Sequence, residues 1–516
     1  MKKFFLIFLV VIGLSSAFFA TGNYGGIFNY LTGADAKTLF PANATDNPSY
    51  TVCRHIFDGL VEFTPTMKIV PALAKSWSIS KDGLVYTFYL RKGVKFQDGT
   101  PFNAQAVKIF FDYVLNHKLR RTSLYKPYIK SVEVVDDYTV AFHLNFPFGG
   151  FLHTLAHGAG LIVDPAMIKK YGDNPGELGR HPIGTGPFEL VEWKEGEIIK
   201  LKANPNYWKG KPYLDGINFK VIPNDMTRLI QVETGGADLT VRVPPIMVDK
   251  LKNDKRVKIE VKPSLRVIYL GFNLKKKPFN DVRIRQALNY AVNKRELCSV
   301  IMRGLATPSD SPLSPLTWGY SSTGGYPYNP EKAKELLKEA GYDANHPLKF
   351  ELVTPRGRYL NDYETAVAIQ AMLKKVNVDI SVRAMEWGSY ISYLFSNPKP
   401  SDAKYQVFLL GWAPSTGDAD WVLRPLFSSK EWPPYGDNNT YYSNPQVDKL
   451  IEAGMKESDP TKRKEDYAKA QKIIVQDAPW IFLYNLQQAV AIKKDVQGVE
   501  VLPVEIVLAK NAWFAK

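Results

Sequence analysis

Two carboxylates and two indoles lie close together in a short segment that follows an apolar run. Asp418 and Asp420 stand between Trp412 and Trp421, directly after the apolar residues 405–410. An ammonium group can donate charge-assisted hydrogen bonds to an aspartate, and an indole face attracts the same cation. The segment therefore predicts a pocket for a positively charged group between flat apolar walls. A second interpretation stays open, in which Asp418 or Asp420 caps the next helix.

Arginines elsewhere in the chain could hold a carboxylate, because a guanidinium forms two parallel hydrogen bonds with that group. Arg358 follows a predicted strand at 348–353, and Arg121 precedes Tyr125 in the first half of the chain. A solvated surface arginine is the alternative interpretation for each of them. Acidic and basic groups gathered at one site would match a zwitterion, which is the pattern of a peptide.

Signatures of other chemistry are absent or weak. His153 and His157 are four residues apart, a spacing that can place two metal ligands on one helix face, but no acidic residue lies within that run. We interpret both as packing or pocket-lining residues and expect neither a metal site nor a cofactor. The motifs of serine hydrolases, zinc proteases, thiol oxidoreductases and nucleotide-binding loops are missing. The sequence favours a binding protein over an enzyme.

The elements of the second half alternate between strands and helices. Strands are predicted at 348–353, 378–382 and 405–410, with helices at 362–375 and 387–395 between them. This alternation indicates a parallel, doubly wound sheet, in which ligands bind beyond the carboxyl ends of the strands. The loops that carry the candidate arginine and aspartates are therefore expected at one edge of the sheet.

The first half is strand-rich, with antiparallel character. Residues 70–96 predict a β-meander whose Asp82-Gly83 turn supplies the positive φ of a tight hairpin, and residues 131–147 predict a second hairpin. Asn103 is a candidate cap for a helix that continues to Val114. Further elements are expected as helices at 280–302, 330–340, 444–455 and 461–476 and as an apolar strand at 480–483.

Length and composition limit the classes of protein that fit. A chain of 516 residues is long enough for more than one compact unit. Its two cysteines, Cys53 and Cys298, exclude a disulfide scaffold, and we interpret them as free thiols although an oxidising compartment would permit a bridge. The formal charge is +15, but the basic residues are scattered, which argues against nucleic acid as a partner.

The first residues indicate export. Residues 1–17 combine Lys2 and Lys3 with an apolar run at 4–14 and small residues at 15–17, which is the pattern of a secretory signal peptide. No cysteine follows that would carry a lipid anchor, and no later stretch is apolar enough for a transmembrane helix. We therefore expect a soluble protein outside the cytoplasm, in the periplasm or its equivalent.

Short motifs occur in a fixed order along most of the remaining chain, at 71–77, 82–96, 184–188 (GTGPF), 272–273, 278–279 and 282–287. Together they resemble the motifs of the family 5 extracytoplasmic solute-binding proteins of ABC importers, which include the dipeptide, oligopeptide and nickel receptors. Within that family, the glutathione-binding branch is the most similar, through residues 120–126, 155–157, 416–434 and 440–451. Gln97 departs from the histidine that the family often has.

The resemblance implies an α/β, two-lobed periplasmic-binding-protein fold of type II, with mixed and parallel sheets and a hinge between lobes. It further implies that Asp418 matches the acidic residue that holds a peptide's α-ammonium, and that Trp412 and Trp421 line the cleft. The implied domains are domain I at 22–60, 181–268 and 483–516, an inserted domain II at 61–180, and domain III at 269–482, with strands crossing between the lobes near 267–273 and 481–488.

The function implied by the resemblance is capture without catalysis. The receptor would close its lobes on glutathione or a di- or oligopeptide and deliver it, as a monomer, to a membrane-embedded permease. Candidate ligand-binding residues are Asp418, Trp412, Trp421, Asp420, Arg358, Arg121, Tyr125 and His157. Two alternatives stay open: the same fold with a nickel chelate, haem or an oligosaccharide as ligand, and an exported hydrolase.

Overall fold

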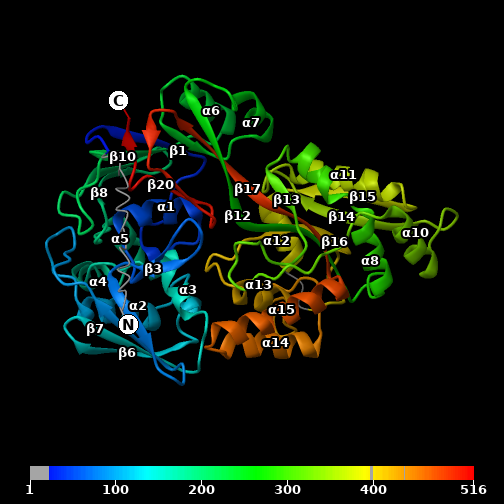
Figure 1. Ribbon diagram of the computed structural model, residues 1–516, viewed down its shortest axis with the longest axis horizontal. Coiled ribbons are helices and arrows are strands. Elements are labelled where there is room, and N and C mark those ends of the chain that lie inside the picture. Colours follow the sequence, from blue (N-terminus) through cyan, green and yellow to red (C-terminus); the bar gives the residue numbers. More distant parts are fainter. Residues whose placement is uncertain (1–21, 396–398, 435, 516) are drawn as a thin grey trace, which may run out of the picture.

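The computed structural model describes residues 22–395, 399–434 and 436–515, so the predicted signal peptide at 1–17 lies outside the described residues. The chain forms two halves, which two long strands join, β12 (Val257–Phe272) and β17 (Trp480–Lys493) (Figure 1). Within the described ranges, no helix is both long and apolar enough to cross a membrane.

One eleven-stranded sheet runs through both halves in the order β15-β14-β16-β12-β17-β11-β1-β10-β9-β8, with β13 paired to β17. Residues 267–272 of β12 pair with β16, and the distal part of β17 pairs with β11, so the two central strands belong to both halves. Their mutual pairing slips between Pro263 and Val267. The other strands are β1 (Ile27–Thr32), β8 (Phe188–Lys194), β9 (Ile198–Ala203), β10 (Gly216–Val221), β11 (Leu239–Val241), β13 (Ala306–Pro308), β14 (Leu348–Pro355), β15 (Val378–Met385) and β16 (Val407–Trp412).

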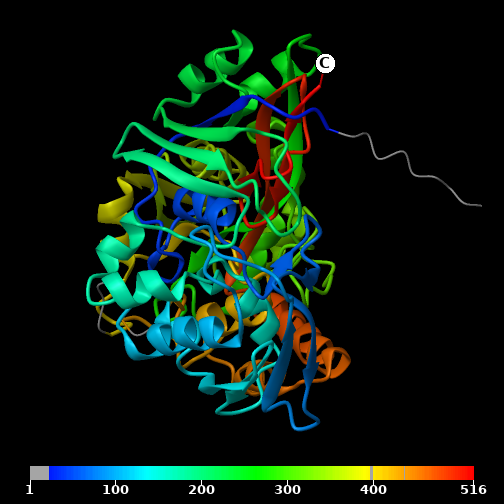
Figure 2. The same cartoon turned by 90° about the vertical axis from the view of Figure 1, so that its left-hand side faces the viewer.

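A separate four-stranded antiparallel sheet, in the order β4-β5-β7-β6, lies at the end of the molecule opposite the C-terminus (Figure 1 and Figure 2). Both hairpins predicted here are confirmed, and Gly83 has φ +69° in the first turn. In the main sheet, by contrast, β1 lies parallel to β10 and β11. The short and separate strands are β2 (Val61–Phe63), β3 (Ile69–Pro71), β4 (Ala74–Ile79), β5 (Val85–Leu90), β6 (Ile129–Asp136), β7 (Thr139–Leu144), β18 (Val496–Gln497), β19 (Glu500–Leu502), β20 (Ile506–Leu508) and β21 (Trp513–Phe514).

Several helices begin where a polar side chain caps the first turn. Asn103 accepts a hydrogen bond from Ala106 N at the start of α2, and Asp46 does the same for Ser49 N at α1. The helices of the first half are α1 (Asn47–Ile56), α2 (Ala104–Asn116), α3 (Phe151–Ala156), α4 (Pro165–Tyr171), α5 (Pro175–Arg180), α6 (Asp225–Glu233) and α7 (Pro245–Leu251).

The second half is layered, with helices on both faces of its sheet. The predicted parallel order is confirmed, since β14 lies parallel to both β15 and β16. One buried core includes residues of α8, α10 and α11, and the other includes residues of α12, α13 and α15. The helices are α8 (Val282–Ala291), α9 (Lys294–Glu296), α10 (Pro330–Glu339), α11 (Asp362–Lys374), α12 (Trp387–Phe395), α13 (Asp420–Phe427), α14 (Pro445–Lys456) and α15 (Pro460–Asp477).

Two predicted elements differ from those observed. The single helix expected at 280–302 is broken, because Val292 takes an extended conformation and Asn293 caps a new turn by accepting from Glu296 N. The strand expected at 480–483 continues to Lys493, because it pairs with β12 along its whole length and, near its end, with β11 on its other side. Cys53 and Cys298 are both free and buried.

Candidate functional site

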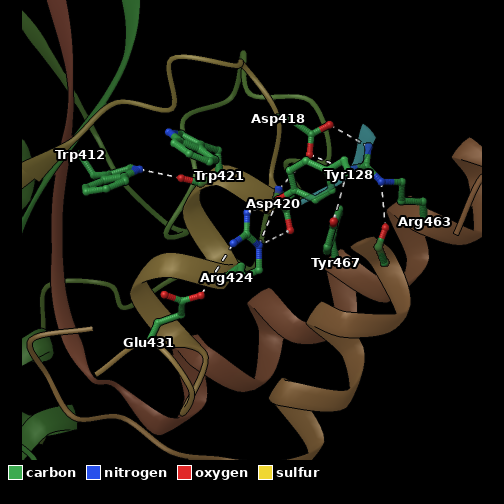
Figure 3. Close-up of polar contacts among 10 residues, drawn as sticks. Tyr128, Trp412, Asp418, Asp420, Trp421, Arg424, Glu431, Arg463 and Tyr467 are labelled. Atoms are coloured by element: carbon green, nitrogen blue, oxygen red, sulfur yellow. Dashed lines mark hydrogen bonds and ion pairs between the residues drawn. The ribbon is translucent and has the colours of Figure 1, made fainter. Parts of the chain in front are cut away.

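The loop between β16 and α13 is held by one buried ion pair (Figure 3). Asp418, only 2% exposed, accepts hydrogen bonds from Arg463 of α15, with 2.7 Å from Nη1 to Oδ2 and 2.6 Å from Nη2 to Oδ1. Burial opposes ionisation, but the guanidinium outweighs it and holds the pKa of Asp418 below its ordinary value. The loop is thereby fixed to a helix that begins 42 residues later.

Two further groups contact the oxygens of the Asp418 carboxylate. Oδ1 also accepts from Asp420 N at 2.9 Å, and Oδ2 lies 3.5 Å from Nδ1 of His153 on α3. Asp418 therefore has a neighbour in each of the roughly four acceptor directions of a carboxylate. The N-cap residue of α13 is Ala419 and it makes no side-chain cap hydrogen bond, so neither aspartate is the helix cap, although Asp418 accepts from the first backbone amide of the helix. A ligand ammonium would have to displace His153 to reach Oδ2.

Asp420 makes a second ion pair on the same helix. Its carboxylate accepts from Nε and Nη2 of Arg424, the latter at 2.9 Å, and is 2% exposed. Arg424 Nη2 also donates to Tyr128 Oη at 3.0 Å, and Tyr128 belongs to the first half of the chain (Figure 3). Asp420 is thus a helix residue that orients Arg424 toward the other half.

The two indoles lie together at this loop. Trp412 Nε1 donates to Trp421 O at 2.8 Å, and both side chains are half-buried (Figure 3). A cavity of about 10 Å³, room for about one water molecule, lies between the two halves. Its lining includes Leu124, Phe148 and Thr154 from the first half, with Asp418 and Trp421 from the second. The two halves are therefore in close contact around Asp418.

The loop after β14 reaches the same sheet edge, as the sequence predicts. Tyr359 Oη donates to Gly411 O at 3.1 Å, which joins it to the end of β16. The Asp362 carboxylate shapes the loop by accepting from the backbone of 357–359. Arg358 is exposed, and its guanidinium lies 4.8 Å from the ring centre of Trp387. Among the described residues, no carboxylate forms an ion pair with Arg358.

A third ion pair lies beside this loop, and no sequence motif predicts it. Arg266 of β12 donates from Nε and Nη2 to Glu505, at 2.7 and 2.6 Å, across 239 residues. Arg266 also lies 5.7 Å from the ring centre of Tyr359. The pair fixes the β19–β20 turn to the point where the pairing of β12 and β17 slips.

The remaining candidates gather inside the first half. Arg121 Nε donates to Ala44 O at 3.1 Å, Tyr125 Oη donates to Thr154 O at 3.3 Å, and His157 Nδ1 accepts from Ala159 N at 3.0 Å. Tyr125 and His157 are buried, and burial lowers the pKa of His157. The side chains of these three residues hydrogen-bond to the backbone of the first half and do not reach the loop around Asp418. In the described part of the chain, no group of three His, Cys, Asp or Glu side chains could hold a metal ion.

Comparison with known proteins identifies the family. Residues 68–434 match the model of bacterial extracellular solute-binding proteins, family 5. Glutathione-binding protein GsiB of Pectobacterium atrosepticum is 38% identical over 479 residues, 91% of each chain, and the Escherichia coli protein of that name is 36% identical over 504 residues, 96% of each.

Comparison with solved structures also finds binding proteins. The periplasmic binding protein DppA of Helicobacter pylori, in complex with the peptide STSA, superposes with a TM-score of 0.77 at 31% identity and covers 96% of this chain and 99% of its own. HbpA2 of Haemophilus parasuis gives a TM-score of 0.84 at 27% identity, with 95% and 100% coverage.

The fold is thus that of a two-lobed α/β binding protein of the type II periplasmic class, and β12 and β17 run through both halves. The chain belongs to the bacterial extracellular solute-binding proteins of family 5.

Proposed function

We propose that this protein is the extracytoplasmic receptor of an ABC importer and captures a peptide-like ligand, either glutathione or a di- or oligopeptide. The relatives named above are glutathione-binding proteins, and one structural neighbour holds a tetrapeptide. The mature chain acts as an exported monomer after loss of residues 1–17, docks on a membrane permease and converts nothing chemically. The inserted domain II at 61–180 carries the first-lobe wall of the cleft.

The observation that carries this proposal is the exposed guanidinium of Arg358 at the sheet edge that Asp418 shares. With no ion-pair partner among the described residues, Arg358 has its full set of donors for a ligand carboxylate. The ring of Trp387 supports one side of the guanidinium, which limits the number of side-chain conformers. Arg358 therefore provides the anionic end of a zwitterion site.

Asp418 provides the cationic end, with one rearrangement. When the lobes open, His153 moves away with the first lobe and uncovers Oδ2 for the ligand's ammonium. Burial, helped by the charge of Arg463, lowers the pKa of His153 to about 4, so the imidazole is neutral and a cation would replace it favourably. Trp412 and Trp421 form the apolar wall beside this group.

Lobe closure follows from the same contacts. A ligand shifts the open–closed equilibrium only if it binds the closed form more tightly, which requires contacts with both lobes. The two strands of the hinge slip in register beside the Arg266–Glu505 pair, where a bend can be absorbed.

Calorimetry with glutathione and a series of di- and tripeptides tests the proposal. We expect saturable binding that weakens about tenfold to a hundredfold in Arg358→Gln and in Asp418→Asn. Arg356→Gln is the matched control, because Arg356 is exposed on the same loop but lies over Tyr363. Absence of binding to every peptide would refute the ligand class. Unchanged affinity in Arg358→Gln would refute the carboxylate role.

A further inference from the structure

A second and much larger pocket lies within the second half. Its volume is about 880 Å³, in the range of roughly 300–1,000 Å³ that is usual for small-molecule sites. Segments 292–299, 308–310 and 324–328 line it. Neither Asp418 nor Arg358 contributes to its lining, so this pocket is distinct from the proposed cleft.

A buried ammonium lines this pocket. Only 6% of Lys294 is exposed, and its Nζ donates to Ser309 O at 3.1 Å. No carboxylate in the described ranges lies within ion-pair distance of it. Asp310 is nearby, but its Oδ1 already accepts from Tyr320 Oη at 2.9 Å. Lys294 therefore keeps two N–H donors without a protein acceptor, although a buried charge is costly unless it is paired.

The electrostatic surroundings of Lys294 favour the arrival of an anion. Burial lowers the pKa of Lys294 to about 8, and the charge of Asp310 only partly offsets this. Arg295 and Glu296 are exposed at the rim and carry opposite charges. An added carboxylate would favour the charged form of Lys294 and raise its pKa again.

Flat apolar groups form the walls. The Tyr326 hydroxyl donates to Val475 O at 2.7 Å, and its ring meets Tyr290 edge-on with ring centres 5.0 Å apart, so that its orientation is fixed. Tyr328, 42% exposed, stands two residues further on. Gly325, at φ +56°, lets the loop approach Asp310, because a Cβ there would lie 2.9 Å from Asp310 Cα.

We propose that this pocket is a second binding site, which takes a small carboxylate with a flat apolar body. The carboxylate accepts hydrogen bonds from Lys294 Nζ, and the body packs against Tyr326 and Tyr328. The site is independent of the proposed peptide cleft, because the two share no lining residue.

Calorimetry with benzoate tests the site, and neutral benzamide serves as the matched ligand. We expect saturable benzoate binding, little or no benzamide binding, and at least about a tenfold loss of benzoate affinity in Lys294→Met. Lys338→Met, an exposed lysine on α10, is the control and should bind as the parent does. Tyr328→Ala is a rim variant that leaves the core intact, and it should weaken benzoate binding about threefold to tenfold.

The pH dependence gives a second measurement. Benzoate affinity should be constant between about pH 6 and about pH 8 and fall above that range, because Lys294 then loses its proton in the free protein. Absence of saturable benzoate binding, displacement of benzoate by glutathione, or equal benzoate affinity in the parent and Tyr328→Ala would each overturn the proposal. If Lys294→Met does not fold, the Tyr328→Ala and pH measurements decide.

Discussion

Arg463 and Asp418 are 45 residues apart in sequence and form two parallel hydrogen bonds in the interior, with both side chains almost fully buried. Arg463 also donates from Nε to Gly454 O at 2.9 Å and lies 4.3 Å from the ring centre of Trp318. The guanidinium thus connects the loop of the candidate site to the helices α14 and α15. The pair holds this loop together with backbone hydrogen bonds to Trp318, which donates to Gly417 O and accepts from Ala419 N.

Removing Arg463 should therefore destabilise the protein strongly. Arg463→Met leaves the Asp418 carboxylate buried without its counter-ion, and we expect a loss of about 3–5 kcal/mol in the free energy of unfolding, measured by urea denaturation. Lys456→Met is the control, because it breaks the half-exposed pair with Glu452 and should cost about 1 kcal/mol or less. A smaller loss in Arg463→Met than in Lys456→Met would contradict the assigned role.

Acid should destabilise the protein through His55. Its Nδ1 lies 2.7 Å from Thr51 O and its Nε2 accepts from Ala509 N at 3.0 Å, so the ring is held neutral. Burial lowers its pKa to about 4, below the 6.5 of an exposed histidine. Between these values the unfolded chain binds a proton that the native chain does not. Stability should therefore fall by about 3 kcal/mol as the pH drops from 6.5 to 4.

The measurement is the unfolding midpoint in urea across that pH range. The urea midpoint of His55→Gln should fall less steeply with decreasing pH than that of the parent, even if the variant is less stable at every pH. His346→Gln should show the same pH dependence of the midpoint as the parent, because His346 is largely exposed. An identical slope in His55→Gln and the parent would show that His55 does not titrate as described.

The GTGPF turn should not tolerate a side chain at Gly186. A Cβ there would lie 2.5 Å from Ile56 C, which is backbone that cannot move aside. Gln97 fills the other side of the turn, donating to Phe188 O at 2.8 Å and accepting from Gly184 N at 3.0 Å. We expect Gly186→Ala to cost about 2 kcal/mol or more in urea denaturation.

Gly236→Ala is the control for that prediction, because the nearest atom to its Cβ would be 3.6 Å away, an ordinary contact. It should change stability by about 0.5 kcal/mol or less. An equal loss of unfolding free energy in Gly186→Ala and Gly236→Ala would show that the GTGPF turn can make room for a side chain.

Tyr128 should contribute to lobe closure. Its hydroxyl accepts from Arg424 across the interface of the two lobes, so Tyr128→Phe removes a bond that separation of the lobes would break. We expect peptide affinity to weaken about threefold to tenfold and the radius of gyration of the ligand-free protein, measured by X-ray scattering, to increase. Tyr113→Phe is the control, since its hydroxyl donates to Gly172 O within the first lobe. An equal effect of the two variants would contradict the assignment.

Local patterns in the sequence predicted most of the elements. Asn103 as a helix cap, the Asp82-Gly83 turn and the alternation of strands and helices from 348 to 410 are confirmed, because each depends on residues close in the chain. The break after Ala291 was not predicted, because the helical spacing of apolar residues continues beyond it. The backbone at Val292, however, is extended and ends the helix.

The candidate site was predicted in part. Placing the Arg358 and Asp418 loops at one sheet edge followed from the parallel order, and the Tyr359–Gly411 hydrogen bond confirms that placement. The roles of the candidate residues toward a ligand stay predictions. The partners of the two aspartates lay beyond sequence reasoning, because nothing near Arg463 distinguishes it from a surface arginine.

The sequence by itself determined the α/β class, the order of the elements and the family, because periodicity, turn residues and motifs are local properties of the chain. Only the tertiary structure decided which charges are already paired. Asp418 forms an ion pair with Arg463, which is 45 residues away in sequence, and Arg266 forms one with Glu505, which is 239 residues away. Arg358 forms an ion pair with no carboxylate among the described residues. A charged side chain looks the same in a sequence whether its partner is a distant residue or a ligand, and folding alone brings the distant partner within hydrogen-bonding distance.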